Sequence, residues 1–173
     1  ENTKEEVIEK VNLAKSVQSK WANLEIDKRI EVLKEIYNKF EENTDKITNL
    51  ISLEMGKPIV QSENEIKSTL KNIKWDLENA KNCIAPEITF ESDKEIQKIF
   101  YEPKGIIVAI SPFNYPFSLC CAIAFQNLIV GNVVISKPDP NLPLLYKFLE
   151  ELLNNSGLPK GVWQFVFGGK EIG

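Results

Sequence analysis

Apolar residues in the first half of the chain recur every three or four positions, the spacing typical of amphipathic α-helices. The pattern predicts four helices, over residues 3–22, from an N-cap at Asp27 to about residue 40, over 44–54 and over about 58–82. Gly56 and Pro58 should end the third helix, because glycine readily adopts the left-handed conformation there and proline cannot extend the helix. The fourth helix is expected to face inward at Ile59, Ile66, Leu70, Ile73, Leu77 and Ala80.

The second half alternates short β-rich runs with helical segments. Residues 94–103 carry apolar positions among charges, which indicates an exposed or edge strand. Strands are then predicted at 105–110, 132–136 and 162–167, with helices at 116–130 and 141–155 between them. Nearly continuous apolar strands joined by helices favour a parallel sheet covered on both faces. The predicted fold class is therefore α/β, a helical segment (1–85) packed on a parallel βαβαβ sheet (104–173).

Composition excludes several classes of partner. The 173 residues are 43% hydrophobic and 27% charged, with 21 basic and 25 acidic residues and a net charge of −4. No broad cationic face is available for nucleic acid, so no nucleic-acid partner is expected. The sequence contains no apolar run of membrane-spanning length, and its first residues are too polar for a signal peptide, so we expect a cytoplasmic protein with no membrane partner.

Histidine is absent, and the cysteine count is odd. Without histidine the chain cannot build a Ser-His or Cys-His pair or a histidine-ligated metal site, and we expect no metal. Three cysteines, two of them adjacent, suit a reducing compartment better than a disulfide framework. We expect Cys83, Cys120 and Cys121 to be packing residues.

Asn114 lies between two prolines at the end of the first sheet strand. Each proline restricts the residue before it to an extended conformation, so the loop from Ser111 to Pro116 should be stiff. A carboxamide held on such a loop is a good hydrogen-bond donor to an oxygen that becomes negatively charged during a reaction. Alternatively, Asn114 merely caps the following helix or satisfies a turn, and spacing alone leaves both interpretations open.

Lys137 follows the second sheet strand, directly before Pro138 and Asp139. At the carboxyl end of a parallel strand, its ammonium could reach a ribose hydroxyl or a phosphate. The alternative is a solvated lysine before a proline turn. The glycine-rich dinucleotide motif G-x-G-x-x-G is missing, so composition and spacing do not identify a cofactor.

Three segments closely resemble motifs of the aldehyde dehydrogenase superfamily: YEPKGIIVAISPFNYPFSL (101–119), GNVVISKPDP (131–140) and SGLPKGVWQFVFG (156–168). Trp21 with Arg29, and LEMGKP at 53–58, also resemble family elements. Phe113 stands where most members have tryptophan, as in the non-phosphorylating glyceraldehyde-3-phosphate, lactaldehyde and succinate-semialdehyde dehydrogenase branch. The resemblance spans nearly the whole chain and implies part of one Rossmann-like NAD(P)-binding domain.

The resemblance assigns roles to several residues. It makes Asn114 the catalytic oxyanion-hole residue, which steadies the thiohemiacetal oxygen formed when a cysteine attacks a small aldehyde substrate. It implies cofactor contacts from Ile110, Ser111, Pro112, Phe113, Lys137, Pro138 and Asp139. The substrate tunnel should include Tyr115, Ser118 and Ala122, and Lys74 resembles a position that carries a phosphate-binding arginine in one branch.

The resemblance also bears on cofactor, assembly and completeness. NAD-preferring members have a glutamate where this chain has Pro140, so NADP is favoured over NAD as the cofactor. Family members commonly pair through a strand arm, which predicts a homo-oligomer of the full-length protein through residues 94–102. The family's nucleophilic cysteine and base lie beyond the last matching motif, so we expect a fragment that is inactive alone. A truncated nucleotide-binding or interaction module and a purely structural α/β domain are the alternatives.

Overall fold

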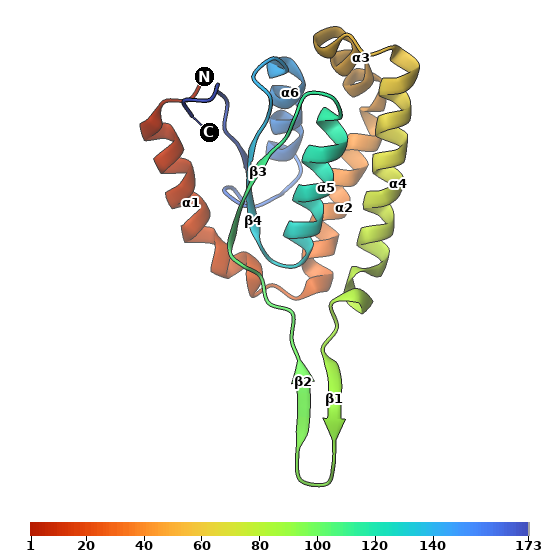
Figure 1. Cartoon of the computed structure of the whole chain (residues 1–173), viewed down its shortest axis with the longest axis vertical. Helices are drawn as coiled ribbons and strands as arrows, with labels where there is room; N and C mark the ends of the chain where they lie inside the picture. The colour runs from red at the N-terminus through yellow and green to blue at the C-terminus, as the bar shows by residue number, and fades with distance from the viewer. Residues whose placement is uncertain (173) are drawn as a thin grey trace.

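The computed structural model describes residues 1–172, which form six helices and five strands (Figure 1). The helices are α1 (Lys4–Ala22), α2 (Ile26–Glu42), α3 (Thr44–Met55), α4 (Ile59–Cys83), α5 (Pro116–Ile129) and α6 (Pro143–Asn154). The strands are β1 (Glu87–Glu91), β2 (Ile96–Ile99), β3 (Ile106–Ile110), β4 (Val133–Lys137) and β5 (Trp163–Phe165). The predicted α/β fold class is confirmed, with a helical first half packed on a three-stranded parallel sheet.

One predicted helix end is confirmed, and two predictions about helix starts are corrected. Gly56 ends α3 at φ 79°, the left-handed conformation that glycine adopts without strain. The predicted N-cap at Asp27 is wrong, because α2 begins at Ile26 and Asp27 lies in its first turn, where its carboxylate accepts a hydrogen bond from Lys81 at 2.6 Å. Ile59 was predicted to face inward, but it is exposed at the start of α4.

The parallel sheet has the strand order β3-β4-β5. Strand β4 is buried in the middle, with α1 on one face and α5, backed by α2 and α4, on the other (Figure 1). The predicted cover on both faces does not extend to β3, where Val108 and Ile110 are 62% and 63% exposed. Since β3 is an edge strand, only one of its sides is paired, and part of its surface is open within the described chain.

An aromatic cluster joins the helical half to the sheet. Phe40 of α2 contacts Phe117, Phe125 and Trp163 edge-to-face, with ring centroids 5.4, 6.2 and 6.3 Å away. Such pairs add about 0.5–1.5 kcal/mol each beyond the area they bury. The cluster therefore holds α2, α5 and β5 in a single core.

Trp21 and Arg29 hold the C-terminal end of α5. The Trp21 indole donates to the carbonyl of Leu128 at 3.0 Å, and Arg29 Nε donates to the carbonyl of Ile129 at 2.9 Å. The last carbonyls of a helix have no partner within the helix, so side chains from elsewhere must satisfy them when they are buried. The only arginine of the chain is thus committed to the fold.

A two-stranded antiparallel hairpin, β1-β2, projects away from the rest of the molecule (Figure 1). The single strand predicted over 94–103 is instead the shorter β2, and its partner β1 was not predicted. Both strands are exposed along their whole length, including the large apolar side chains Ile88, Phe90, Ile96 and Ile99. Residues 87–91 (EITFE) nevertheless alternate polar and apolar side chains, a strand signal that the prediction overlooked.

Candidate active site

The Asn114 loop connects the carboxyl end of β3 to the start of α5. Tyr115 is the N-cap of α5, with φ −134° and ψ 66°, and Pro116 occupies the first helical position. Proline suits this position because its fixed φ is helical and its missing N–H is not needed there. The Asn114 side chain is exposed and makes no hydrogen bond to residues 1–172, so it neither caps α5 nor satisfies a turn.

A buried lysine–glutamate pair holds the backbone of this loop. Lys57, just before α4, donates from Nζ to Glu65 Oε2 at 2.6 Å, and both side chains are almost fully buried. The same Nζ donates to the backbone carbonyl of Asn114 at 2.7 Å and lies 4.1 Å from the centroid of the Tyr115 ring. The backbone of Asn114 is therefore clamped while its side chain stays free.

Glu65 also supplies the cap that α5 lacks locally. No side chain within the loop caps α5, and its first turn contains no acidic residue. Glu65 Oε1, reaching over from α4, accepts the backbone N–H groups of Phe117 and Ser118, both at 3.0 Å. The buried Tyr146 hydroxyl donates to the carbonyl of Pro116 at 2.9 Å. Consecutive peptide groups at the start of α5 are thus fixed by side chains distant in sequence.

A cavity of about 270 Å³ opens beside the loop. Its lining is mostly polar and consists of Lys57, Gln61, Asn64, Glu65, Ser68, Tyr115 and Ser118. Of the predicted tunnel residues, Tyr115 and Ser118 line it, whereas Ala122 and Lys74 do not. Lys74 is exposed and lies nine residues beyond Glu65 on α4, which at 100° per residue is the opposite face of the helix.

The predicted cofactor residues at the two strand ends lie side by side. Ile110 pairs with Lys137 in the β3-β4 register, and the N–H of Ser111 donates to the carbonyl of Lys137 at 3.2 Å. The Ser111 side chain points inward, buried and without a hydrogen-bond partner among residues 1–172. Ile110, Pro112 and Phe113 are exposed. This segment could therefore meet a ligand through its backbone and its apolar side chains.

Lys137 is partly buried and leads into the turn before α6. In that turn Asp139 Oδ1 accepts the backbone N–H and the side-chain amide of Asn141, both at 2.9 Å. A cavity of about 110 Å³ lies here, at the carboxyl ends of β4 and β5. It is lined by Glu1, Pro138, Asp139, Pro140, Pro143, Lys147, Phe167 and Gly168. Its charged residues are one lysine, Lys147, and two carboxylates, Glu1 and Asp139.

None of the three cysteines has the environment of a nucleophile near Asn114. Burial raises the pKa of Cys120 to about 12, although the Ser136 and Ser111 side chains offset part of the rise. Burial likewise raises the pKa of Cys121. Cys83 is exposed but is the last residue of α4, whereas Lys57 and Asn114 lie at the other end, roughly 36 Å away at 1.5 Å per residue.

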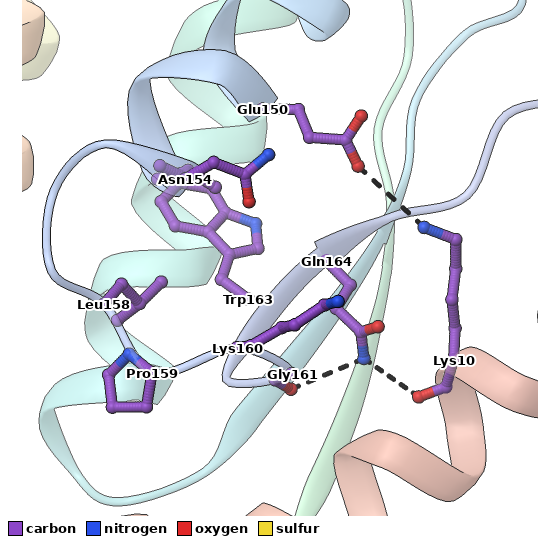
Figure 2. A pocket seen from close by; sticks show the side chains of 10 residues that line it. Lys10, Glu150, Asn154, Leu158, Pro159, Lys160, Gly161, Trp163 and Gln164 are labelled. Atoms are coloured by element: carbon purple, nitrogen blue, oxygen red, sulfur yellow. Dashed lines mark hydrogen bonds and ion pairs between the residues drawn. The ribbon is translucent and has the colours of Figure 1, made fainter.

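Another cavity, of about 280 Å³, lies at the amino end of β5 and includes no predicted site residue (Figure 2). The Gln164 amide faces it but already donates to the carbonyls of Lys10 and Gly161, at 2.9 and 3.4 Å. Lys10 and Glu150 form an ion pair at 3.8 Å across it (Figure 2). The Gln164 amide and the Lys10–Glu150 pair thus connect α1 to β5 and α6.

Two negative findings concern residues 1–172 alone. No helix there is both long and apolar enough to cross a lipid bilayer. Within the same range, no three histidine, cysteine or carboxylate side chains gather as metal ligands would.

Sequence reasoning missed the pair that anchors the loop. Lys57 was noted only within a helix-ending element, and Glu65 was not singled out. One signal was available: Phe117 and Ser118 follow Pro116 at the start of α5 without any capping side chain, so their N–H groups needed an acceptor from elsewhere. Which residue would supply it depends on how α4 packs against α5, which local sequence does not specify.

The comparisons with known proteins agree across the whole chain. The family model described as "Aldehyde dehydrogenase family" matches residues 1–173. The N-succinylglutamate 5-semialdehyde dehydrogenase of Legionella pneumophila (strain Paris) is 28% identical over 171 residues, 99% of this chain and 34% of the relative. The malonate-semialdehyde dehydrogenase of Listeria monocytogenes serotype 4b (strain F2365) is 27% identical over 172 residues, 99% of this chain and 35% of the relative. The chain spans about a third of the length of these curated relatives.

Solved structures give the same result. The NADP-dependent glyceraldehyde-3-phosphate dehydrogenase from Bacillus halodurans C-125, complexed with NADP, superposes with a TM-score of 0.89 at 30% identity, over 98% of this chain and 37% of that one. Lactaldehyde dehydrogenase from Escherichia coli superposes with a TM-score of 0.84 at 29% identity, over 91% of this chain and 33% of that one. From its fold, its motifs and a family match along its whole length, the chain belongs to the aldehyde dehydrogenase family.

Proposed function

We propose that this chain contributes the oxyanion-binding amide and part of the cofactor site to an NAD(P)-dependent oxidation of an aldehyde to a carboxylic acid. The observation that carries the proposal is the Asn114 side chain. It is exposed and free of hydrogen bonds to residues 1–172, on a loop whose backbone is clamped at the carboxyl end of a parallel strand. Ligands of open α/β sheets bind at this edge.

Asn114 acts by hydrogen bonding. When a thiolate adds to the aldehyde carbon, the carbonyl oxygen becomes an alkoxide, and the Asn114 NH₂ donates to it. Because the loop is already fixed, the donor needs little reorganisation as charge develops, which is the condition under which such donors lower a barrier most. The thiol and the base come from outside residues 1–173 in this proposal, since Cys120 and Cys121 are buried and Cys83 lies at the far end of α4.

The strand ends carry the cofactor part of the proposal. NAD(P)⁺, when bound, accepts the hydride that leaves the former aldehyde carbon. Ile110, Pro112 and Phe113 would lie along it, and the Lys137 ammonium would hold a ribose hydroxyl. The residues fit such a group: the partly buried Lys137 lies directly before a proline-lined cavity at the carboxyl end of the sheet.

The test of the oxyanion role is Asn114→Ala in the complete protein, assayed with a small aldehyde. Loss of one such donor lowers rates by roughly 10²- to 10³-fold, so kcat should fall by that factor while the Kd for NADP⁺ stays unchanged. Asn72→Ala, an exposed asparagine on α4, is the matched control. Undiminished turnover in the Asn114→Ala protein would refute the oxyanion role, whereas a complete protein that turns over no aldehyde would favour a nucleotide-binding or interaction module.

The cofactor is proposed to be NADP⁺ in preference to NAD⁺. Pro140 places no carboxylate next to the ribose-binding turn, and Lys147 lines the adjacent cavity. The opposing charges are Glu1 and Asp139, of which Asp139 is partly satisfied by Asn141. We expect kcat/KM to be higher with NADP⁺, and Lys147→Gln to reduce that preference. A strong preference for NAD⁺ contradicts this assignment without affecting the role of Asn114.

A further inference from the structure

We propose that Lys57 is a positioning residue for this reaction: its ammonium fixes the Asn114–Tyr115 peptide and thereby aims the Asn114 amide. The inference rests on the proposed function, because it gives Asn114 a role that depends on its orientation. It concerns a residue that touches neither the aldehyde nor the cofactor in that proposal. Lys57 acts through the backbone of the loop.

Every polar contact of the Lys57 ammonium serves this loop or its support. Nζ donates to Glu65 Oε2 at 2.6 Å and to the carbonyl of Asn114 at 2.7 Å, and it faces the Tyr115 ring. Glu65 in turn holds the first N–H groups of α5, the helix that follows the loop. One ammonium therefore links α4, the Asn114 carbonyl and the cap of α5.

The placement of this pair differs from that of an ordinary surface ion pair. Glu63 and Lys67 form such a pair on the same helix, with side chains 44% and 64% exposed. The Lys57 and Glu65 side chains are only 6% and 0% exposed. A buried ion pair is often no more stabilising than an apolar replacement, so its geometry is the better explanation for its use. Here that geometry ends on the carbonyl of Asn114, whose side-chain amide is exposed and makes no hydrogen bond to residues 1–172.

Removing the ammonium should misplace the amide without removing it. Without Lys57 the Asn114 carbonyl has no other hydrogen-bond donor among residues 1–172, and the peptide can rotate. A shift of about 1 Å in a positioned group can lower a rate by about 100-fold. The loss should therefore approach, but not exceed, the loss caused by removing the amide itself.

The experiment is a double-mutant cycle in the complete protein. Lys57→Met keeps the apolar stem, and we expect kcat to fall by about 10- to 100-fold with the Kd for NADP⁺ unchanged. In an Asn114→Ala background, the same substitution should lower kcat by less than about 3-fold, because there is no amide left to aim. Lys57→Arg, which restores the charge and donors, should recover part of the loss. A purely structural role would lower stability equally in both backgrounds and show no such dependence on Asn114.

Lys67→Met, which breaks the exposed pair on the same helix, is the control and should leave kcat unchanged. If Lys57→Met does not fold, Glu65→Gln replaces it, since it keeps the side-chain size and an acceptor oxygen but removes the charge that holds Lys57. The positioning role is overturned if either variant keeps full kcat while Asn114→Ala is slow, or if it lowers kcat equally in both backgrounds. An Asn114→Ala protein with full activity would instead overturn the proposed function itself.

Discussion

The β3–α5 and β4–α6 corners, the connections from a strand to the next helix, both need an acceptor for the first N–H groups of the helix, and they supply it in different ways. Each helix starts with a proline, and neither is capped by a side chain of its own loop. Each is capped instead by a carboxylate from the helical half. Glu65 accepts hydrogen bonds from two N–H groups of α5, and Glu54 accepts them from the N–H groups of Leu144 and Leu145 at 2.8 and 2.7 Å. The difference is that Glu65 is fully buried and ion-paired, whereas Glu54 is only partly buried.

Because of this difference, the first corner fixes the position of a loop, whereas the second only stabilises the start of a helix. The N-terminus of a helix attracts anions, and in both corners a protein carboxylate already occupies the N–H groups concerned. At α6 the carboxylate caps the helix and contacts solvent. At α5 the carboxylate also carries Lys57, whose remaining donor fixes the Asn114 carbonyl. A buried charged pair is costly to break, so the first corner tolerates less movement than the second.

The largest expected effect is that of Glu65→Ala. This substitution leaves the Lys57 ammonium buried without its carboxylate partner and two N–H groups of α5 without their acceptor. Breaking a buried pair in this way typically costs about 3–5 kcal/mol. Urea denaturation measures the free energy of unfolding, and Glu63→Ala on the same helix should cost less than about 1 kcal/mol. Comparable losses in the two variants would show that the buried Glu65 contributes no more to stability than the exposed Glu63.

Glu54→Ala should have a smaller effect. It removes the cap of α6 but strands no buried charge, so the expected cost is that of a lost helix cap, about 1–2 kcal/mol. Glu54→Gln, which retains an acceptor oxygen, should recover part of the loss. The same urea titration is the measurement. A cost that matches that of Glu65→Ala would show that the ion pair adds nothing to the first corner.

The smallest effect concerns pH, through the thiol that neighbours Ser111 and Ser136 at the two strand ends. Burial raises the pKa of Cys120 from its usual 9.0 to about 12 in the folded protein. The folded state thus keeps the proton that the unfolded state releases above pH 9. The stabilisation is full below pH 9 and is lost as the pH rises towards 12. By pH 10 the free energy of unfolding has fallen by about 1 kcal/mol. Cys120→Ala should make the fall in unfolding free energy between pH 8 and 10 less steep, with the buried Cys121 thiol keeping its own contribution, and an unchanged slope would contradict the assignment.

The sequence allowed most of the fold to be predicted where apolar periodicity was strong. The four N-terminal helices follow from burial of one face every 3.6 residues, and the βαβαβ order follows from nearly continuous apolar runs separated by helical segments. Strand β1 was overlooked although its residues alternate, and the exposed side of β3 was missed because its residues are as apolar as those of a covered strand. Asn114 and Lys137 could be picked out as candidates because they lie at or just beyond the carboxyl ends of strands.

The contacts that support the candidate site could not be predicted in the same way. Lys57 reads as part of the segment that ends α3 and Glu65 as an ordinary charged residue of an amphipathic helix, and only the packing of α4 on α5 shows that they are buried. Lys74 lies on the same helix but does not line the cavity, and half a turn of rotation separates it from Glu65. Distinguishing such positions requires the rotation of a helix about its axis, which its neighbours determine.

Helix α5 is held at both ends by residues that precede it in the chain. Glu65 satisfies its first N–H groups, and Trp21 and Arg29 satisfy carbonyls of its last turn. The N-terminus of a chain leaves the ribosome first, so all three side chains are already available when residues 116–129 emerge. The helical half can thus serve as a template on which the central crossover of the sheet forms during synthesis.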